Sequence, residues 1–121
     1  MALTDKEKMV EIVKILDAKK AGKIGAIFVE EKTIIASYFV ICTAGSLTQL
    51  RALADELEEK MGEKGEPPVK IEGKNESGWT LVDFGGVIVH IFTAEMREFY
   101  DLERLWTDAP KVDITDLLTK D

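Results

Sequence analysis

Residues 79–92 hold the feature that most constrains the fold, because two strand-like runs here flank a Gly85-Gly86 pair. A Gly-Gly pair between such runs is typical of a two-residue hairpin turn. That turn would fix the strand register, so that position 83 faces 88, 81 faces 90 and 79 faces 92. Since side chains alternate along a strand, the register predicts two faces of different composition.

The two predicted faces of this hairpin differ in kind. One is nearly all apolar and is expected to be buried; its members are Thr80, Val82, Phe84, Val87, Val89 and Ile91. The other mixes aromatic, acidic and imidazole groups; its members are Trp79, Leu81, Asp83, Ile88, His90 and Phe92. Trp is enriched at binding hot spots, so this mixed face is a candidate contact surface. An equally good prediction is that a helix covers it, with Asp83 and His90 satisfying each other diagonally.

Helix signals occur at three places along the chain. Thr4 and Glu7 match a capping box ahead of an apolar stripe at helical spacing. Ser46 repeats the capping pattern before a second striped segment. Thr93 can cap a third helix that runs to about Trp106. These signals predict three helices, one before the strands and two between or after them.

Strand signals occur at 26–30, 38–43 and 69–72, in addition to the two hairpin arms. The resulting order, α-β-β-α-β-β-β-α, predicts a single α/β domain with a mixed five-stranded sheet flanked by helices. We expect this domain to span residues 1–109. Because Pro110 cannot continue the last helix, residues 110–121 are expected to form a loosely ordered C-terminal tail.

Composition limits the classes of function. Acidic residues outnumber basic ones 23 to 16, which gives a formal charge of −7. This charge disfavours direct nucleic-acid binding and suits a basic protein partner. The same charge is equally explained by solubility alone. With one cysteine, Cys42, and one histidine, neither an internal disulfide nor a structural zinc site is expected. No apolar run is long enough to span a membrane, and no signal-peptide core is present, so we expect a cytoplasmic protein.

Candidate catalytic groups are few. Cys42 lies in an apolar strand, where a cysteine is usually inert, and Ser46 is explained as a helix cap. Glu56 and Glu58 follow a Gly-Ser pair, as the metal-binding acids of nucleotidyltransferases do, but they fall inside a predicted helix. Positions i and i+2 of a helix do not face each other, so the two carboxylates cannot hold one ion. No glycine-rich phosphate loop is present either. The sequence predicts no catalytic residue, metal or cofactor.

Five stretches of the chain carry a recognisable pattern: Ser37-Tyr-Phe-Val-Ile-Cys-Thr-Ala-Gly45-Ser46, Gln49 with Ala52-Leu-Ala-Asp55, Gly78-Trp-Thr-Leu-Val-Asp83-Phe-Gly85, Val89-His90-Ile-Phe92 and Arg97-Glu-Phe-Tyr-Asp-Leu-Glu103-Arg-Leu-Trp106. Taken in order over roughly residues 5–113, they resemble the ribosomal silencing factor (Iojap-related) family. The last block is the most specific of them.

The resemblance implies a nucleotidyltransferase-like fold without that activity. It also implies a translation repressor that binds the large ribosomal subunit through a basic ribosomal protein, uL-fourteen, and blocks joining of the small subunit. A homodimer of the free protein is implied as well. The partner-binding residues that it implies are Trp79, Leu81 and Asp83 on the hairpin, with Tyr100 and Glu103 on the following helix.

The chain departs from the family pattern at four positions. Ser37 and Phe28 stand where family members usually have an aspartate, Phe84 replaces a usual tyrosine, and Gly86 replaces a usual aspartate of the turn. Two other classes stay open beside the repressor: a nucleotidyltransferase-like enzyme, which would need a strand-borne acid pair, and a generic dimeric protein-interaction domain. Only the resemblance separates the repressor from the last of these.

Overall fold

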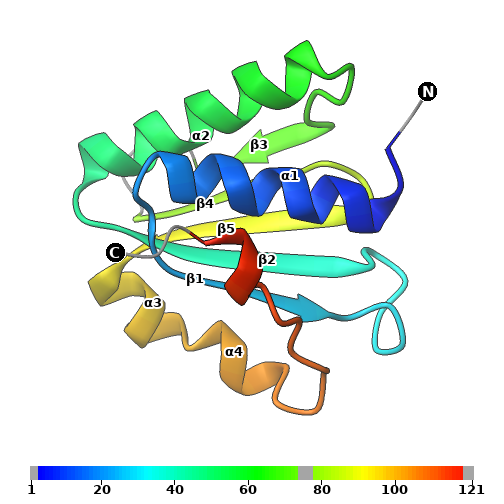
Figure 1. The fold of residues 1–121 in the computed structure, drawn as a ribbon. Coiled ribbons are helices and arrows are strands. Elements are labelled where there is room, and N and C mark those ends of the chain that lie inside the picture. The colour runs from blue at the N-terminus through cyan, green and yellow to red at the C-terminus, as the bar shows by residue number, and fades with distance from the viewer. Residues whose placement is uncertain (1–2, 74–77, 119–121) are drawn as a thin grey trace.

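The computed structural model describes residues 3–73 and 78–118, which form a five-stranded sheet with helices on both faces (Figure 1). Strands β1 (Gly22–Phe28), β2 (Tyr38–Ala44), β3 (Lys70–Glu72), β4 (Trp79–Asp83) and β5 (Val87–Thr93) are arranged in the order β1-β2-β5-β4-β3. β2 and β5 pair in parallel, and the other neighbouring pairs are antiparallel. The predicted mixed five-stranded α/β fold is confirmed.

Helices α1 (Asp5–Ala18) and α2 (Leu47–Glu63) cover one face of the sheet. The Thr4 hydroxyl accepts a hydrogen bond from Glu7 N, and Glu7 accepts one from Thr4 N, which confirms the capping box. Ser46 caps α2 by accepting from Gln49 N. The apolar stripes of both helices pack on the sheet and form the larger core with Val82, Val89, Ile91 and their neighbours. Local caps and stripes thus place the first two helices as the sequence predicts.

Helices α3 (Ala94–Tyr100) and α4 (Leu102–Leu105) lie on the opposite face (Figure 1). A single helix to about Trp106 was expected, but Asp101 adopts a left-handed backbone, with φ 47° and ψ 50°, and divides it. Aspartate tolerates this conformation better than most residues, because its short polar side chain can bond locally. The break turns Leu102 and Trp106 onto the sheet, where they pack against the second apolar cluster.

Residues 110–118 of the segment expected to form a C-terminal tail lie along the outer edge of β1, and residues 119–121 of that segment lie outside the described residues. Phe28 N donates to Pro110 O and Val112 N donates to Ala26 O, each at 2.8 Å. Ile114 is 7% exposed and belongs to the larger core, just before a short 3-10 helix at Thr115–Leu117. Because β1 is an edge strand, this segment satisfies backbone groups that would otherwise face solvent.

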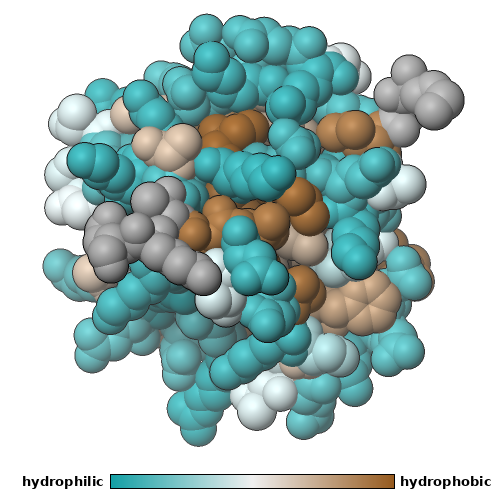
Figure 2. All heavy atoms as spheres, viewed as in Figure 1, coloured by the Kyte–Doolittle hydropathy of each residue, from teal (hydrophilic) through white to brown (hydrophobic). Residues whose placement is uncertain are grey.

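The face drawn in Figure 2 is mostly hydrophilic, and hydrophobic residues gather in bands between the polar ridges. None of the helices in the described part of the chain combines the length and the apolar character that crossing a bilayer requires.

Candidate protein-docking surface

The hairpin has the register that its Gly85-Gly86 turn predicts. Trp79 pairs with Phe92, Leu81 with His90 and Asp83 with Ile88, and Phe84 N donates to Val87 O across the turn. The predicted apolar face is buried throughout against α1 and α2; its members Thr80, Val82, Phe84, Val87, Val89 and Ile91 are at most 3% exposed. The mixed face therefore points to the side on which α3 and α4 lie.

The mixed face is divided between the two strands of the hairpin. On β5, Ile88, His90 and Phe92 are buried, because Met96, Leu102 and Trp106 of the helical layer help to cover this side of the sheet. On β4, the Trp79, Leu81 and Asp83 side chains are only partly buried. Of the two sequence-based interpretations, a helical cover fits the β5 half and an open surface fits the β4 half.

Trp79 lies in an aromatic cluster that continues to the surface. Its ring stacks on Phe92 at 5.2 Å between centroids and meets Tyr100 of α3 at 4.6 Å. Tyr100 in turn lies edge-on to Phe99 at 5.1 Å. Phe99 is 73% exposed and Tyr100 is 44% exposed. We call the four residues Trp79, Leu81, Phe99 and Tyr100 the aromatic patch; Leu81 and Trp79 also share a shallow hollow beside β3.

The patch joins three of the five residues predicted for partner binding: Trp79, Leu81 and Tyr100. Asp83 lies one strand repeat beyond Leu81, next to the turn, and its Oδ1 accepts a hydrogen bond from Gly85 N at 2.8 Å. It does not contact His90 as the diagonal pairing expected. Instead His90 Nδ1 lies 3.2 Å from the Trp79 indole Nε1, which donates to it.

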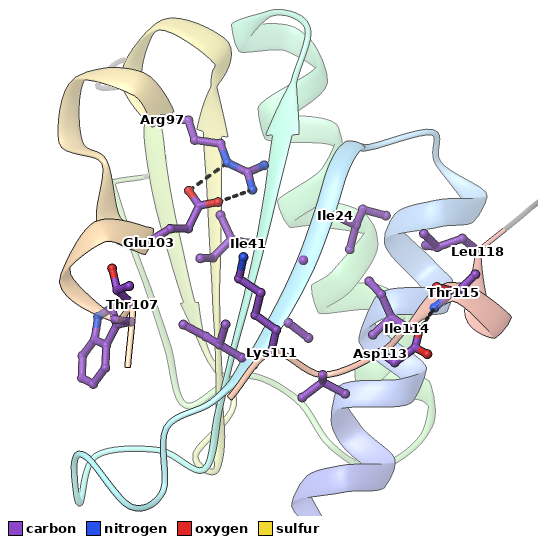
Figure 3. Close-up of a pocket in the computed structure, with 15 residues that line it drawn as sticks. Ile24, Ile41, Arg97, Glu103, Thr107, Lys111, Asp113, Ile114, Thr115 and Leu118 are labelled. Carbon is purple, nitrogen blue, oxygen red and sulfur yellow. Dashed lines mark hydrogen bonds and ion pairs between the residues drawn. The ribbon is translucent and has the colours of Figure 1, made fainter. Parts of the chain in front are cut away.

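Glu103 lies apart from the aromatic patch, in an ion pair with Arg97. The two guanidinium contacts with Glu103 are 3.2 Å and 2.9 Å (Figure 3). Arg97 also donates to Lys23 O and Thr43 Oγ1. These hydrogen bonds from Arg97 hold the pKa of Glu103 below its usual value. The pair lines a cavity of about 510 Å³, together with residues of β1, Ile41 of β2, Trp106, Thr107 and residues between Lys111 and Leu118. The Glu103 charge is therefore already balanced within the protein.

The groups considered for catalysis have structural roles or lie apart. Cys42 is fully buried, and burial raises the pKa of its thiol to about 12, so no thiolate nucleophile forms at neutral pH. Ser46 caps α2. Glu56 and Glu58 both lie within α2, at positions that do not face each other. Within residues 3–73 and 78–118, no three His, Cys, Asp or Glu side chains gather as a metal site requires.

Two departures from the family pattern meet at the turn beside the start of α1. A Cβ added to Gly86 would lie 1.9 Å from Asp5 Oδ1, so the Asp5 carboxylate occupies the space that a side chain at position 86 would need. Ser37 Oγ lies 2.7 Å from the same carboxylate and 2.9 Å from Glu30 Oε1. The small residue at each position thus accommodates Asp5 next to the turn.

Sequence reasoning missed Phe99 as part of the surface. In one continuous helix, Phe99 would fall near the apolar stripe of Met96, Leu102 and Trp106, and a stripe position predicts burial. The break at Asp101 changes the helix direction directly after Tyr100, so Phe99 stays outside. Only the aspartate itself, as a residue that tolerates a left-handed conformation, could have indicated this break.

The sequence is similar to a known protein family over nearly its whole length. Residues 2–121 match the family described as "Ribosomal silencing factor during starvation". The chain is 42% identical over 98 residues to the ribosomal silencing factor of Bacillus subtilis, covering 81% of this chain and 83% of that protein. It is 34% identical over 117 residues to the one from Halalkalibacterium halodurans, covering 97% and 100%.

A solved structure gives the same result for the fold. The crystal structure of a Chromobacterium violaceum protein superposes with a TM-score of 0.84 at 30% identity, covering 87% of this chain and 88% of that one. The similarity thus extends over the sheet, the helical layers and the hairpin rather than one local motif. The chain belongs to the ribosomal silencing factor family.

Proposed function

We propose that this protein is a non-enzymatic translation repressor. It binds the large ribosomal subunit through the basic ribosomal protein uL-fourteen, and the bound domain occupies space that the small subunit needs. Family membership supports ribosome-associated regulation of translation. The proposed site is the aromatic patch together with Asp83.

The observation that carries the proposal is an exposed aromatic cluster on an acidic protein. Phe99 and Tyr100 are 73% and 44% exposed, beside a partly buried Trp79. Apolar anchors of this kind dominate the binding energy of protein interfaces, and truncating one typically costs about 2 kcal/mol or more. The net charge of −7 favours a basic partner and speeds its approach. In the complex, Trp79 would fill an apolar pocket and Asp83 would pair with a lysine or arginine.

Glu103 has a different role in this proposal from the one that the resemblance implies. Its carboxylate is engaged by Arg97, which also donates to Lys23 O of β1 and Thr43 Oγ1 of β2, whereas Trp79 lies on β4. We therefore place it outside the contact surface. We also propose, from the resemblance alone, that the free protein is a cytoplasmic homodimer, which sedimentation equilibrium of the purified chain tests.

Cosedimentation with purified ribosomal subunits tests the main proposal. The wild type is expected to pellet with the large subunit only, and Trp79→Ala and Asp83→Lys to bind at least tenfold more weakly. Ile34→Ala and Glu59→Lys are matched controls, because both residues are exposed and lie outside the proposed site. Equal binding by all five proteins would contradict the site, and binding to neither subunit would contradict the function.

A subunit-joining assay tests the steric part separately. Large subunits incubated with the protein should form fewer joined ribosomes when small subunits are added, and Trp79→Ala should restore joining. Unchanged joining at saturating protein would refute the blocking mechanism while leaving the binding site intact.

A further inference from the structure

His90 is a polar residue in an apolar place. It is the only histidine of the chain, lies on β5 between Ile88 and Phe92, and is 4% exposed. Its ring meets Phe39 edge to face at 4.9 Å. Its Nε2 is buried and has no hydrogen-bond partner among the described residues. A buried polar atom left without a partner costs about 1–3 kcal/mol, so packing alone favours an apolar residue here.

The hydrogen bond with Trp79 determines the state of the imidazole. The indole Nε1–H can only donate, so His90 Nδ1, at 3.2 Å, must be an unprotonated acceptor. The proton of the neutral ring is therefore assigned to Nε2, the atom without a partner. Burial lowers the pKa of His90 to about 4, so the ring stays neutral, and Nδ1 stays an acceptor, at neutral pH.

We propose that His90 is a positioning residue for the docking surface: by accepting the indole hydrogen bond it holds Trp79 in the orientation that a partner recognises. This inference rests on the proposed function. Trp79 bridges the core and the surface, because it stacks on buried Phe92 and meets exposed Tyr100. Its orientation thus sets the shape of the whole aromatic patch.

The same hydrogen bond specifies what the partner presents. Because the indole N–H is engaged with His90, it is not offered to the partner as a donor. The partner must therefore meet the indole through its rings, with an aliphatic side chain or with a lysine or arginine over the aromatic face. A cation suits the acidic charge of this chain. A partner that recognises Trp79 through a carbonyl acceptor does not fit.

Two substitutions at position 90 separate positioning from stability. His90→Leu keeps an apolar side chain and removes the buried atom without a partner, but it cannot accept from the indole. His90→Asn loses ring volume, yet its amide oxygen can stand where Nδ1 stands. Leucine should therefore give the more stable protein and asparagine the better oriented Trp79. A purely structural role for His90 predicts instead that affinity follows stability.

Thr80→Val is the matched control on the same hairpin. Thr80 is also fully buried, and its Oγ1 donates to Gly73 O at 2.9 Å, but it lies on the opposite face of β4 from Trp79. The substitution removes a buried hydrogen bond at nearly constant shape and leaves the indole contact untouched. It should lower the melting temperature without changing affinity.

Hydrogen exchange of the Trp79 indole N–H, followed by NMR, measures positioning without any partner. Trp106 supplies the second indole signal and is removed by Trp106→Phe for assignment. We expect fast Trp79 exchange in His90→Leu and protected exchange in His90→Asn, Thr80→Val and the wild type. A two-bond ¹H–¹⁵N spectrum of the wild type should show His90 protonated at Nε2. Protonation at Nδ1, or unchanged exchange in His90→Leu, would overturn the proposal.

Binding to the large subunit completes the test, with each variant held below its melting temperature. His90→Leu should bind about tenfold more weakly than the wild type, while His90→Asn should stay within about twofold. Affinities that rank with melting temperature would overturn the positioning role. If the wild type itself binds no large subunit, the proposed function fails, and the indole exchange still decides whether His90 holds Trp79.

Discussion

Replacing Ile114 by alanine tests whether residues 110–118 belong to the fold. Ile114 is 7% exposed and packs in the larger core beneath α1. Alanine lacks three of its carbon atoms, and at about 0.8 kcal/mol for each buried carbon the lost transfer free energy is about 2.5 kcal/mol. The residual cavity adds little, because a segment near the chain end can partly collapse into it.

Thermal and urea unfolding, followed by circular dichroism, measure this loss. For a chain of 121 residues, a loss of about 2.5 kcal/mol corresponds to a melting temperature lower by about 10 °C. Ile34→Ala is the control, because Ile34 is fully exposed and its substitution should leave the free energy of unfolding nearly unchanged. If Ile114→Ala costs less than about 0.5 kcal/mol, the packing argument is refuted and the segment is held as loosely as Pro110 alone suggests.

Three further predictions concern titrating and reactive groups. Folding lowers the pKa of His90 from 6.5 to about 4, so between these pH values only the unfolded state binds the imidazole proton. The free energy of unfolding should therefore fall by up to about 3 kcal/mol as the pH drops from 6.5 to 4. Urea unfolding of His90→Leu should lack this loss. The lowered pKa of Glu103 contributes stability above about pH 4.5, and this contribution is lost in more acidic solution. In Arg97→Gln, the melting temperature should therefore depend less steeply on pH in the acidic range than in the wild type. Native Cys42 should resist iodoacetamide and react fully in urea, as mass spectrometry will show, whereas rapid native alkylation would contradict its burial.

The hairpin and the first two helices could be predicted because their signals are local. A two-residue Gly-Gly turn fixes the pairing of every residue from 79 to 92, and strand alternation then fixes the faces. Thr4 and Ser46 mark helix starts through hydrogen bonds to residues three positions on. Each of these features depends on neighbours in sequence, so the chain alone contains the information.

What the sequence did not indicate depends on distant contacts. Ile114 is one apolar residue in a polar stretch, and it is buried because α1 and the open edge of β1 leave room for it. Likewise the sequence of the mixed face does not indicate how far α3 and α4 extend over it. The sequence alone could therefore not predict that His90 is buried and that Phe99 is exposed. The predicted partner-binding residues, Trp79, Leu81, Asp83, Tyr100 and Glu103, therefore stay a prediction, and the sequence did not indicate which neighbours share their exposure.

The limits of the aromatic patch follow from the helix break at Asp101. Asp101 tolerates its left-handed backbone better than most residues do, and a contact across the break adds to this tolerance. Arg97 belongs to α3 and Glu103 to α4, and their two-point ion pair spans the break, a geometry that is among the stronger charge-assisted contacts. With α4 held in this direction, Trp106 covers Phe39 on the β2 side, at 5.0 Å. On β4, the Trp79, Leu81 and Asp83 side chains are only partly buried, so the helical cover ends between the two strands of the hairpin.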